Sequence, residues 1–347
     1  MVKMDKQDLY KKLVYQNIED ALAELNAEDK GRYYICNCPE CNAHEAFIYK
    51  NNTNFIQCNR ENHCGERMLL QFQEKESLHP EREKIQKTFP SLSDDQKEAL
   101  TWSMRLFSFA KTGTKSEILD NGYRGLSKEN AREHIVDLQN EQVASYFFNK
   151  TSSLLGKDYS NNSWMCKRNL VFPLYDENNV LNRVLLRSSI DPTLEPKEIQ
   201  LIMNPSKETK DFFMEIPEET KTIVFSESLL DALSFREIDP NCGFVALTGA
   251  SKTRQLQACI KENKGAFTDK HILMAMDDDK AGWKATQKLV ATLRTEGLDE
   301  NISLFRYSDG FIDANEFLQG NRMQFTKRYL QDTKQLQRTK QMHHEMS

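Results

Sequence analysis

Apolar positions recur with different periods in successive parts of the chain, and each period predicts a different kind of structure. Between residues 94 and 149 the spacing is mainly helical. Within that region Ser127 is expected to cap a helix that begins at Lys128, with Asn130 at its third position. Residues 164–205 instead carry two apolar runs around the polar segment DENN, and this arrangement predicts a β-hairpin.

From about residue 221 short apolar runs alternate with amphipathic segments. The runs are TIVF, FVAL, HILMAM and ISLFRY, and they recur at intervals of roughly 25 residues. Strands that alternate with helices in this way predict βαβ units and a mainly parallel sheet. The polar residues after Gly320 are expected to form a terminal helix.

The N-terminal part follows a third pattern. Residues 1–30 predict one amphipathic helix or two short ones. In residues 33–66 the runs AFIYK and NFIQC flank NNTN, which predicts a second hairpin. Pro80 and Pro90 lie in a charged segment and indicate a domain boundary. The expected domains are residues 1–90, 91–215, 216–320 and 321–347.

Composition limits the class of protein. The chain has 347 residues, of which 29% are charged, and a net charge of −5. No apolar run approaches the ~20 residues of a membrane span, and the N-terminus lacks a signal-peptide core, so we expect a cytoplasmic protein without membrane contact. Basic residues nevertheless cluster in CKRNLVF and NRVLLRSS, which leaves room for a local basic groove despite the acidic average.

Acidic residues follow the predicted parallel strands. Glu227 comes directly after TIVF, Asp277 and Asp279 come after HILMAM, and Asp313 lies beyond ISLFRY. The carboxyl ends of parallel strands meet at one edge of a sheet, so these side chains are expected to converge, with Asp278 pointing away. Converging carboxylates repel unless a cation lies among them, and Mg²⁺ is a hard ion that prefers such oxygens.

A cysteine-rich segment predicts a zinc site. Cys38-x2-Cys41 and Cys58-x5-Cys64 flank the N-terminal hairpin, which is the arrangement of a zinc ribbon with a Cys₄ site. Because the second spacing is wide, the fourth ligand stays open between Cys64 and two rivals. These rivals are His63 and Cys36, and His44 is a candidate for orienting a ligand.

The acidic segments resemble the Toprim family. FSESLLDAL, MAMDDDKAGWKA and DANEFL match its glutamate after the first strand, its Asp-x-Asp with Ala-Gly, and its late acidic element. The resemblance implies Glu227, Asp277 and Asp279 as core acids, with Asp231 and Asp313 in support. The chain departs from the family at Ser228, where glycine is usual, and at Asn315, where a second acid is usual.

Upstream segments resemble DnaG-type bacterial and phage primases. GYRGLSKENA is similar to the segment that opens their polymerase domain, RNLVFPLYDENNVLNRVLLRS to their basic strand pair, MNPSKET to their Asn-Ser-Pro region, and ALTGASKT to a Gly-Thr turn. The resemblance implies that basic residues bind template phosphates or nucleotide: Arg168, Arg187, Lys197, Lys207 and Lys252. The family's Gly-Gly before the second arginine is Leu-Leu here.

Together these features predict a multidomain α/β protein. It combines a Cys₄-type zinc ribbon, a mixed α+β basic polymerase subdomain and a Rossmann-like parallel Toprim sheet. The resemblance implies a DNA primase that uses Zn²⁺ in the ribbon and Mg²⁺ or Mn²⁺ at the acids, with single-stranded DNA as template and ribonucleoside triphosphates as substrates. The absence of a helicase-binding domain after Asp313 is typical of phage, plasmid and mobile-element enzymes, so a replicative helicase or initiator is expected in trans.

Three other functions share the Toprim fold. A nuclease with an ATPase in the same chain needs a phosphate loop, and the motif G-x-x-x-x-G-K-[ST] does not occur. A topoisomerase fragment needs a nucleophilic tyrosine in a large extra domain, and residues 320–347 offer only Tyr329. A non-catalytic DNA-binding mediator is disfavoured by the polymerase-like residues 120–205.

Overall fold

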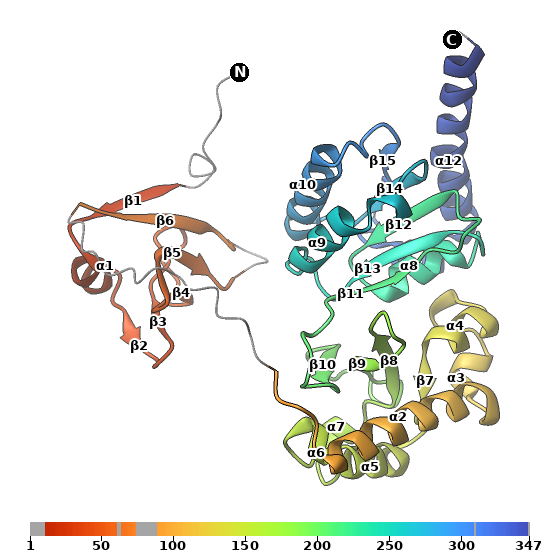
Figure 1. The fold of residues 1–347 in the computed structure, drawn as a ribbon, viewed down its shortest axis with the longest axis horizontal. Coiled ribbons are helices and arrows are strands. Elements are labelled where there is room, and N and C mark those ends of the chain that lie inside the picture. The colour runs from red at the N-terminus through yellow and green to blue at the C-terminus, as the bar shows by residue number, and fades with distance from the viewer. Residues whose placement is uncertain (1–10, 61–63, 74–88, 309, 346–347) are drawn as a thin grey trace. The chain divides into compact units, whose positions relative to one another are not determined.

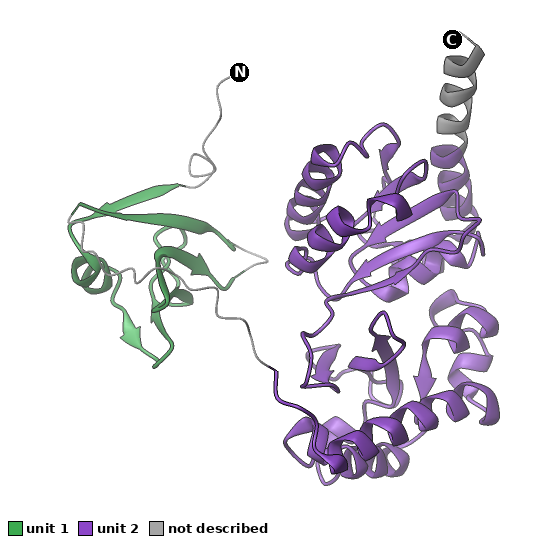
Figure 2. Ribbon diagram, in the orientation of Figure 1, with its two compact units in different colours: residues 1–87 green, residues 88–347 purple. Residues whose placement is uncertain are grey.

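The computed structural model describes residues 11–60, 64–73, 89–308 and 310–345. The chain divides into two compact units, residues 1–87 and 88–347 (Figure 2). Among the helices described, none has the length and apolar character that crossing a bilayer requires.

The first unit is built on one sheet with the strand order β1-β6-β5-β4-β3-β2 (Figure 1). Its elements are β1 Lys12–Tyr15, α1 Ile18–Glu24, β2 Glu28–Asp29, β3 Tyr33–Cys36, β4 Ala46–Tyr49, β5 Asn52–Cys58 and β6 Arg67–Phe72. β1 pairs in parallel with β6, and the other neighbours are antiparallel. The predicted hairpin is therefore confirmed as β4 and β5.

The expectation for residues 1–30 is correct only for α1. Lys12–Tyr15 forms a strand instead, because Leu13 and Tyr15 alternate with exposed residues and pack on the core of this unit. Asn17 then caps α1 by accepting a hydrogen bond from the Asp20 backbone at 2.9 Å. The expected structure of residues 1–10 and the Pro80 segment lie outside the described residues.

The second unit begins with the long helix α2, followed by shorter helices around a four-stranded antiparallel sheet, β10-β9-β8-β7. Its elements up to residue 202 are α2 Asp94–Gly113, α3 Glu117–Asp120, η2 Tyr123–Gly125, α4 Lys128–His134, β7 Val136–Asp137, α5 Glu141–Lys150, α6 Ser152–Leu155, α7 Ser163–Cys166, β8 Leu170–Tyr175, β9 Leu181–Arg187 and β10 Ile199–Ile202. Ser127 caps α4 through the Asn130 backbone, as predicted. β8 and β9 are the predicted hairpin, whose turn is held by two backbone N–H groups that donate to Asp176 at 2.9 Å.

A five-stranded sheet with the order β11-β13-β12-β14-β15 follows. The remaining elements are β11 Phe212–Glu215, β12 Thr222–Ser226, α8 Leu229–Arg236, β13 Gly243–Leu247, α9 Arg254–Glu262, η3 Lys264–Ala266, β14 His271–Ala275, α10 Lys280–Thr295, β15 Ile302–Leu304, α11 Ala314–Gly320 and α12 Arg322–Glu345. β12 through β15 are mutually parallel, as predicted. The edge strand β11 runs antiparallel to β13 and was not anticipated from the sequence.

Helices cover both faces of this sheet (Figure 1). One core contains the apolar residues of α8, α11 and the start of α12, among them Phe235, Phe317 and Phe325. The opposite core contains those of α9 and α10, among them Ile260 and Leu289. This layering leaves the carboxyl ends of the parallel strands for polar residues.

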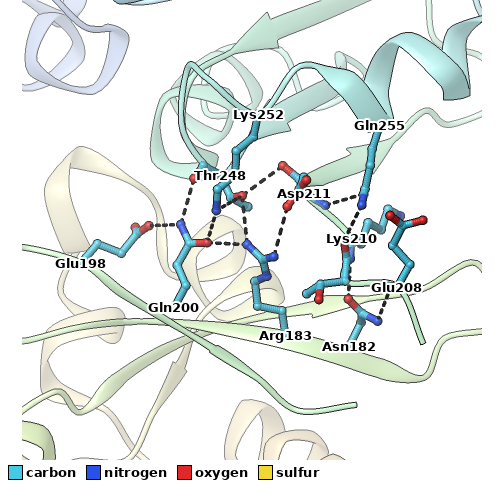
Figure 3. A network of polar contacts seen from close by, with 11 residues as sticks. Asn182, Arg183, Glu198, Gln200, Glu208, Lys210, Asp211, Thr248, Lys252 and Gln255 are labelled. Atoms are coloured by element: carbon cyan, nitrogen blue, oxygen red, sulfur yellow. Dashed lines mark hydrogen bonds and ion pairs between the residues drawn. The ribbon is translucent and has the colours of Figure 1, made fainter. Parts of the chain in front are cut away.

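A polar network joins the antiparallel sheet to the parallel one (Figure 3). Arg183 on β9 is 8% exposed, and its guanidinium donates to Asp211 at 3.1 Å and to Gln200. Gln200 also accepts from Lys252 at 2.6 Å and donates to the Thr248 carbonyl at 2.8 Å. The network therefore fixes the loop after β13 relative to β9 and β10.

Candidate active site

Acidic side chains gather where the parallel strands end. Glu227 follows β12 and Asp277 lies just beyond β14, while Asp231 lies in the first turn of α8. Asp279 caps α10 and Asp313 caps α11. The sheet thus brings together carboxylates that are far apart in the sequence.

A cavity of about 240 Å³ lies between these acids and the antiparallel sheet. Its lining residues are Arg124, Leu185, Arg187, Glu198, Glu227, Ser228, Leu230, Asp231, Leu247, Thr248, Gly249, Asp277, Asp313 and Asn315. It therefore presents carboxylates opposite arginines, the pairing that phosphate and cation ligands require. Asp279 is not among the lining residues, and Asp278 lines a different cavity.

Two of these carboxylates have oxygens without a partner. Glu227 Oε2 and Asp277 Oδ1 are buried and make no hydrogen bond within the described structure. Burial and the neighbouring carboxylates raise the pKa of Glu227 to about 7 and that of Asp277 to about 9. A buried polar atom without a partner calls for an ion or a water, and both residues therefore fit a divalent cation.

The other acids are held by hydrogen bonds. Asp231 is 5% exposed and accepts from the Ser228 hydroxyl and, at 3.0 Å, from the Asn315 backbone. Asp279 and Asp313 accept from the backbones of Gly282 at 2.7 Å and Glu316 at 2.6 Å. The starts of α10 and α11 therefore fix the positions of these two carboxylates.

Close packing explains the Ala-Gly pair after the aspartates. A Cβ atom on Gly282 would lie 2.1 Å from the Asp277 carbonyl oxygen. Any larger residue would push the first turn of α10 away from the strand end, and Asp277 would move with it.

Arg124 is a site residue that sequence reasoning missed. It has a positive φ of 53°, which is strained for an arginine, and its Nε donates to Asn315 Oδ1 at 2.6 Å. Gln319 donates to the same oxygen at 2.9 Å. Asn315 Oδ1 therefore accepts two hydrogen bonds from the protein. At the position where the Toprim family usually has a second acid, this chain has a side chain that bonds to Arg124. The segment GYRGLSKENA was the signal that could have identified this arginine.

The predicted basic residues are placed in different environments. Arg187 lines the cavity and pairs with Glu198 at 3.0 Å, and Lys252 belongs to the network beside Thr248. Lys197 is exposed, and Lys207 pairs with Asp176 at 2.7 Å. Arg168 is fully buried, stacks on the Trp164 ring at 4.4 Å, and donates to the backbone carbonyls of residues 196 and 197. The Arg168 guanidinium is thus engaged by the loop after β9.

The four predicted cysteines of the first unit come together. Cys38, Cys41, Cys58 and Cys64 bring their sulfur atoms within 4.8 Å of one another. The separations are 3.8 Å for Cys38 with Cys64 and for Cys41 with Cys58. Zn–S bonds of about 2.3 Å in tetrahedral geometry give sulfur separations of this size. The donor set therefore fits Zn²⁺, with Cys64 as the fourth ligand.

One of the two rival zinc ligands lies outside the cysteine cluster. Cys36 is buried in the core of this unit and is not part of the cluster, whereas His63 lies outside the described residues. The ring of His44 hydrogen-bonds to Asn37 at 2.8 Å.

A second cluster was not anticipated from the sequence. His134 Nε2 lies 3.1 Å from Glu215 Oε2, and Glu133 completes a potential ligand group. Arg236 also donates to Glu215 at 2.5 Å, and His134 and Arg236 together lower the Glu215 pKa to about 2. The Arg236 guanidinium thus balances the Glu215 carboxylate, and the cluster ties α4 and α8 to β11.

Comparison with known proteins supports the assignment of the parallel sheet. Residues 224–318 match the family model described as Toprim-like, which confirms the predicted Toprim domain. No curated protein sequence matches the chain.

Several solved primases are similar to this chain. The Aquifex aeolicus primase, with zinc-binding and RNA polymerase domains, is 16% identical with a TM-score of 0.46, over 91% of this chain and 82% of that one. The primase fragment of the bacteriophage T7 primase-helicase is 16% identical with a TM-score of 0.42, over 87% and 99%. A DNA primase domain from Pseudomonas aeruginosa is 17% identical with a TM-score of 0.44, over 67% and 78%.

Proposed function

We propose that the chain is a DNA primase that synthesises short RNA primers on single-stranded DNA by metal-dependent nucleotidyl transfer. The observation that carries this proposal is the pair of partnerless oxygens on Glu227 and Asp277, in a cavity that also presents Arg124 and Arg187. Carboxylates that hold a cation beside arginines that bind phosphate are the groups that phosphoryl chemistry requires.

Glu227 and Asp277 would hold Mg²⁺ or Mn²⁺, with Asp279 and Asp313 near them at the helix starts. A bound cation would neutralise triphosphate oxygens and increase the acidity of the attacking hydroxyl. Asp231, fixed by Ser228 and Asn315, adds negative charge close to the two ligands and keeps the site selective for cations.

The arginines of the cavity would bind the triphosphate. The planar guanidinium of Arg187 can contact two phosphate oxygens at once, and Glu198 holds it in place. The hydrogen bond from Arg124 to Asn315 fixes the orientation of the arginine side chain. The positive φ of Arg124 is strained, and such a conformation persists only where the surrounding structure holds it.

The remaining basic residues would contribute around the cavity. Lys252 lies beside the Thr248 loop that lines it, whereas exposed Lys197 can contact template phosphates. Arg168 would act on the template indirectly by positioning the loop that carries Lys197. Lys207 would need to leave Asp176 to bind phosphate.

The first unit would bind the single-stranded template. Tyr33, Phe47 and Tyr49 form edge-to-face contacts with ring centroids 5.1–6.3 Å apart, and both tyrosines are partly exposed. Aromatic side chains on a zinc ribbon offer stacking surfaces for unpaired bases. In this proposal residues 1–90 carry template binding, residues 91–215 the basic polymerase subdomain and residues 216–320 catalysis, with residues 321–347 as a helical tail. A helicase or initiator supplied in trans, and service in a mobile element or phage, are part of the same proposal.

The test is primer synthesis on a panel of single-stranded DNA templates with labelled ribonucleotides and Mg²⁺ or Mn²⁺. Wild type is compared with Asp277→Ala and with Asp299→Ala as a matched control, since Asp299 is exposed and away from the cavity. We expect template-dependent oligoribonucleotides from wild type and Asp299→Ala only. Template cleavage that depends on Asp277, without synthesis, would assign the site to a nuclease instead.

A further inference from the structure

A second cavity of about 370 Å³ lies on the other side of the strand end that carries the aspartates. Its lining residues are Met274, Met276, Asp277, Asp278, Trp283, Thr286, Leu304, Phe305, Arg306 and Tyr307. Asp277 lines both cavities, whereas the other members belong to the second alone. The volume falls within the range of small-molecule sites.

An aromatic ring is held at the mouth of this cavity. Trp283 is 50% exposed although it is a large apolar side chain, and its indole Nε1 donates to Asp278 Oδ1 at 3.1 Å. This hydrogen bond fixes the orientation of the ring, so that its face is available at little cost in conformational entropy. Met276 and Leu304 supply further apolar surface, and Leu304 is itself 37% exposed.

The polar groups of the cavity differ in sign. Asp277 and Asp278 supply carboxylates, and Arg306 supplies an exposed guanidinium. Among the described residues Arg306 makes no ion pair within 4.0 Å, although its charge partly offsets the rise that burial causes in the pKa of the Asp332 carboxyl, and no hydrogen bond reaches Asp278 Oδ2. A ligand that matches these groups has a flat face for the indole, an N–H donor for the carboxylate and an anion for the arginine.

We propose that this cavity is a nucleotide-binding subsite. The base packs on Trp283, its exocyclic amino group donates to Asp278, and its phosphate pairs with Arg306. Carboxylates accept hydrogen bonds from the amino groups of bases, whereas uracil and thymine have none to offer. The nucleotide is either a free ribonucleotide or a residue of a strand near the active site. The role of the subsite in synthesis rests on the proposed function, because Asp277 is shared.

Binding can be measured separately from catalysis, in equilibrium dialysis of the full chain without added divalent metal. The probes are labelled CTP and UTP for the free nucleotide, and dC and dT decamers for the strand. We expect the cytosine probes to bind more tightly than the uracil or thymine probes. Whichever of CTP and the dC decamer binds more tightly shows whether the ligand is a free nucleotide or a residue of a strand. Trp283→Ala should weaken binding roughly 5- to 100-fold, the range spanned by base–aromatic stacking.

Matched variants exclude a general effect on the fold. Trp283→Phe keeps a stacking face and should retain most of the affinity, whereas Arg306→Ala should lose it. Arg294→Ala is the control, because Arg294 is exposed on the same helix as Trp283 and lines neither cavity. Equal affinity of wild type, Trp283→Ala and Arg306→Ala, or no preference for cytosine, would overturn the subsite. Primer synthesis lost in Asp277→Ala would still stand in that case, so the two proposals fail separately.

Discussion

The side chain of Arg124 donates from Nε to Asn315 Oδ1 at 2.6 Å, across 191 positions of sequence. Asn315 Nδ2 donates in return to the Arg124 carbonyl at 3.0 Å and to the Ser234 hydroxyl at 3.0 Å. This reciprocal contact connects the turn before α4 to the start of α11. An amide is the only common side chain of this size that can accept from Arg124 and donate to both oxygens.

Asn315→Asp is therefore expected to destabilise the protein, although it restores the acid usual in the Toprim family. A carboxylate would face the Arg124 carbonyl and lose two donated hydrogen bonds, at a cost of about 1–3 kcal/mol in the free energy of unfolding. Denaturant unfolding measures this cost, with Asn178→Asp in the exposed β8–β9 turn as the control. A variant as stable as wild type would show that the reciprocal contact contributes little.

Asp277→Asn should make the metal-free protein more stable while abolishing activity. The substitution removes a buried acid whose pKa is raised by burial and by its carboxylate neighbours. We expect a gain of about 1 kcal/mol at pH 8, as is common where an active-site acid is neutralised. The measurement is thermal unfolding with and without Mg²⁺. Wild type should gain stability from Mg²⁺, and the variant should not.

Removal of zinc should unfold the first unit selectively. Cys41→Ser or Cys58→Ser removes one of four ligands, and structural zinc sites lose their folding energy with the metal. Cys36→Ala is the control, since Cys36 lies outside the cluster and alanine adds no polar group to the core around it. Zinc content by mass spectrometry and protease sensitivity within residues 11–73 report the result. Full zinc occupancy in Cys58→Ser would contradict the assigned ligand set.

Arg183→Met should weaken the contact between the two sheets of the second unit and lower the free energy of unfolding. The substitution keeps most of the volume but leaves Asp211 without its cation at 3.1 Å and removes one of the two donors to Gln200, the other being Lys252 (Figure 3). Breaking a largely buried pair costs about 3–5 kcal/mol. Denaturant unfolding should show this loss, whereas Arg294→Met, an exposed pair, should change stability by less than about 1 kcal/mol.

The Glu215 cluster predicts loss of stability in acid. His134 and Arg236 lower the Glu215 pKa from 4.5 in the unfolded chain to about 2 in the folded protein. Because its pKa is lowered on folding, ionised Glu215 stabilises the folded protein. This contribution is fully present above about pH 4.5 and is lost as the pH falls toward 2. Unfolding measured from pH 7 to pH 2 should show this loss, and Glu215→Gln should flatten that part of the profile. An unchanged profile would mean that the cluster does not couple to folding.

The sequence by itself determined the elements whose cause is local. The alternation of strands and helices predicted the parallel sheet, because the hydrophobic period of each element depends only on neighbouring residues. Ser127 predicted the start of a helix for the same reason, since a cap bonds to a backbone group three residues away. The carboxylates were predicted to meet because topology alone places the ends of parallel strands at one edge. The cysteine spacing predicted three zinc ligands and left the fourth open.

Only the tertiary structure decided which of these side chains are accessible to a ligand and which are held by other parts of the protein. Arg168 reads as a phosphate ligand in the sequence, yet packing against Trp164 and the loop at residues 196–197 buries it. The β1 strand depends on pairing with β6, more than fifty residues away, which no local pattern records. The link between Arg124 and Asn315 likewise depends on two distant turns coming into contact, because hydrogen bonds between remote segments follow from packing rather than from neighbouring residues.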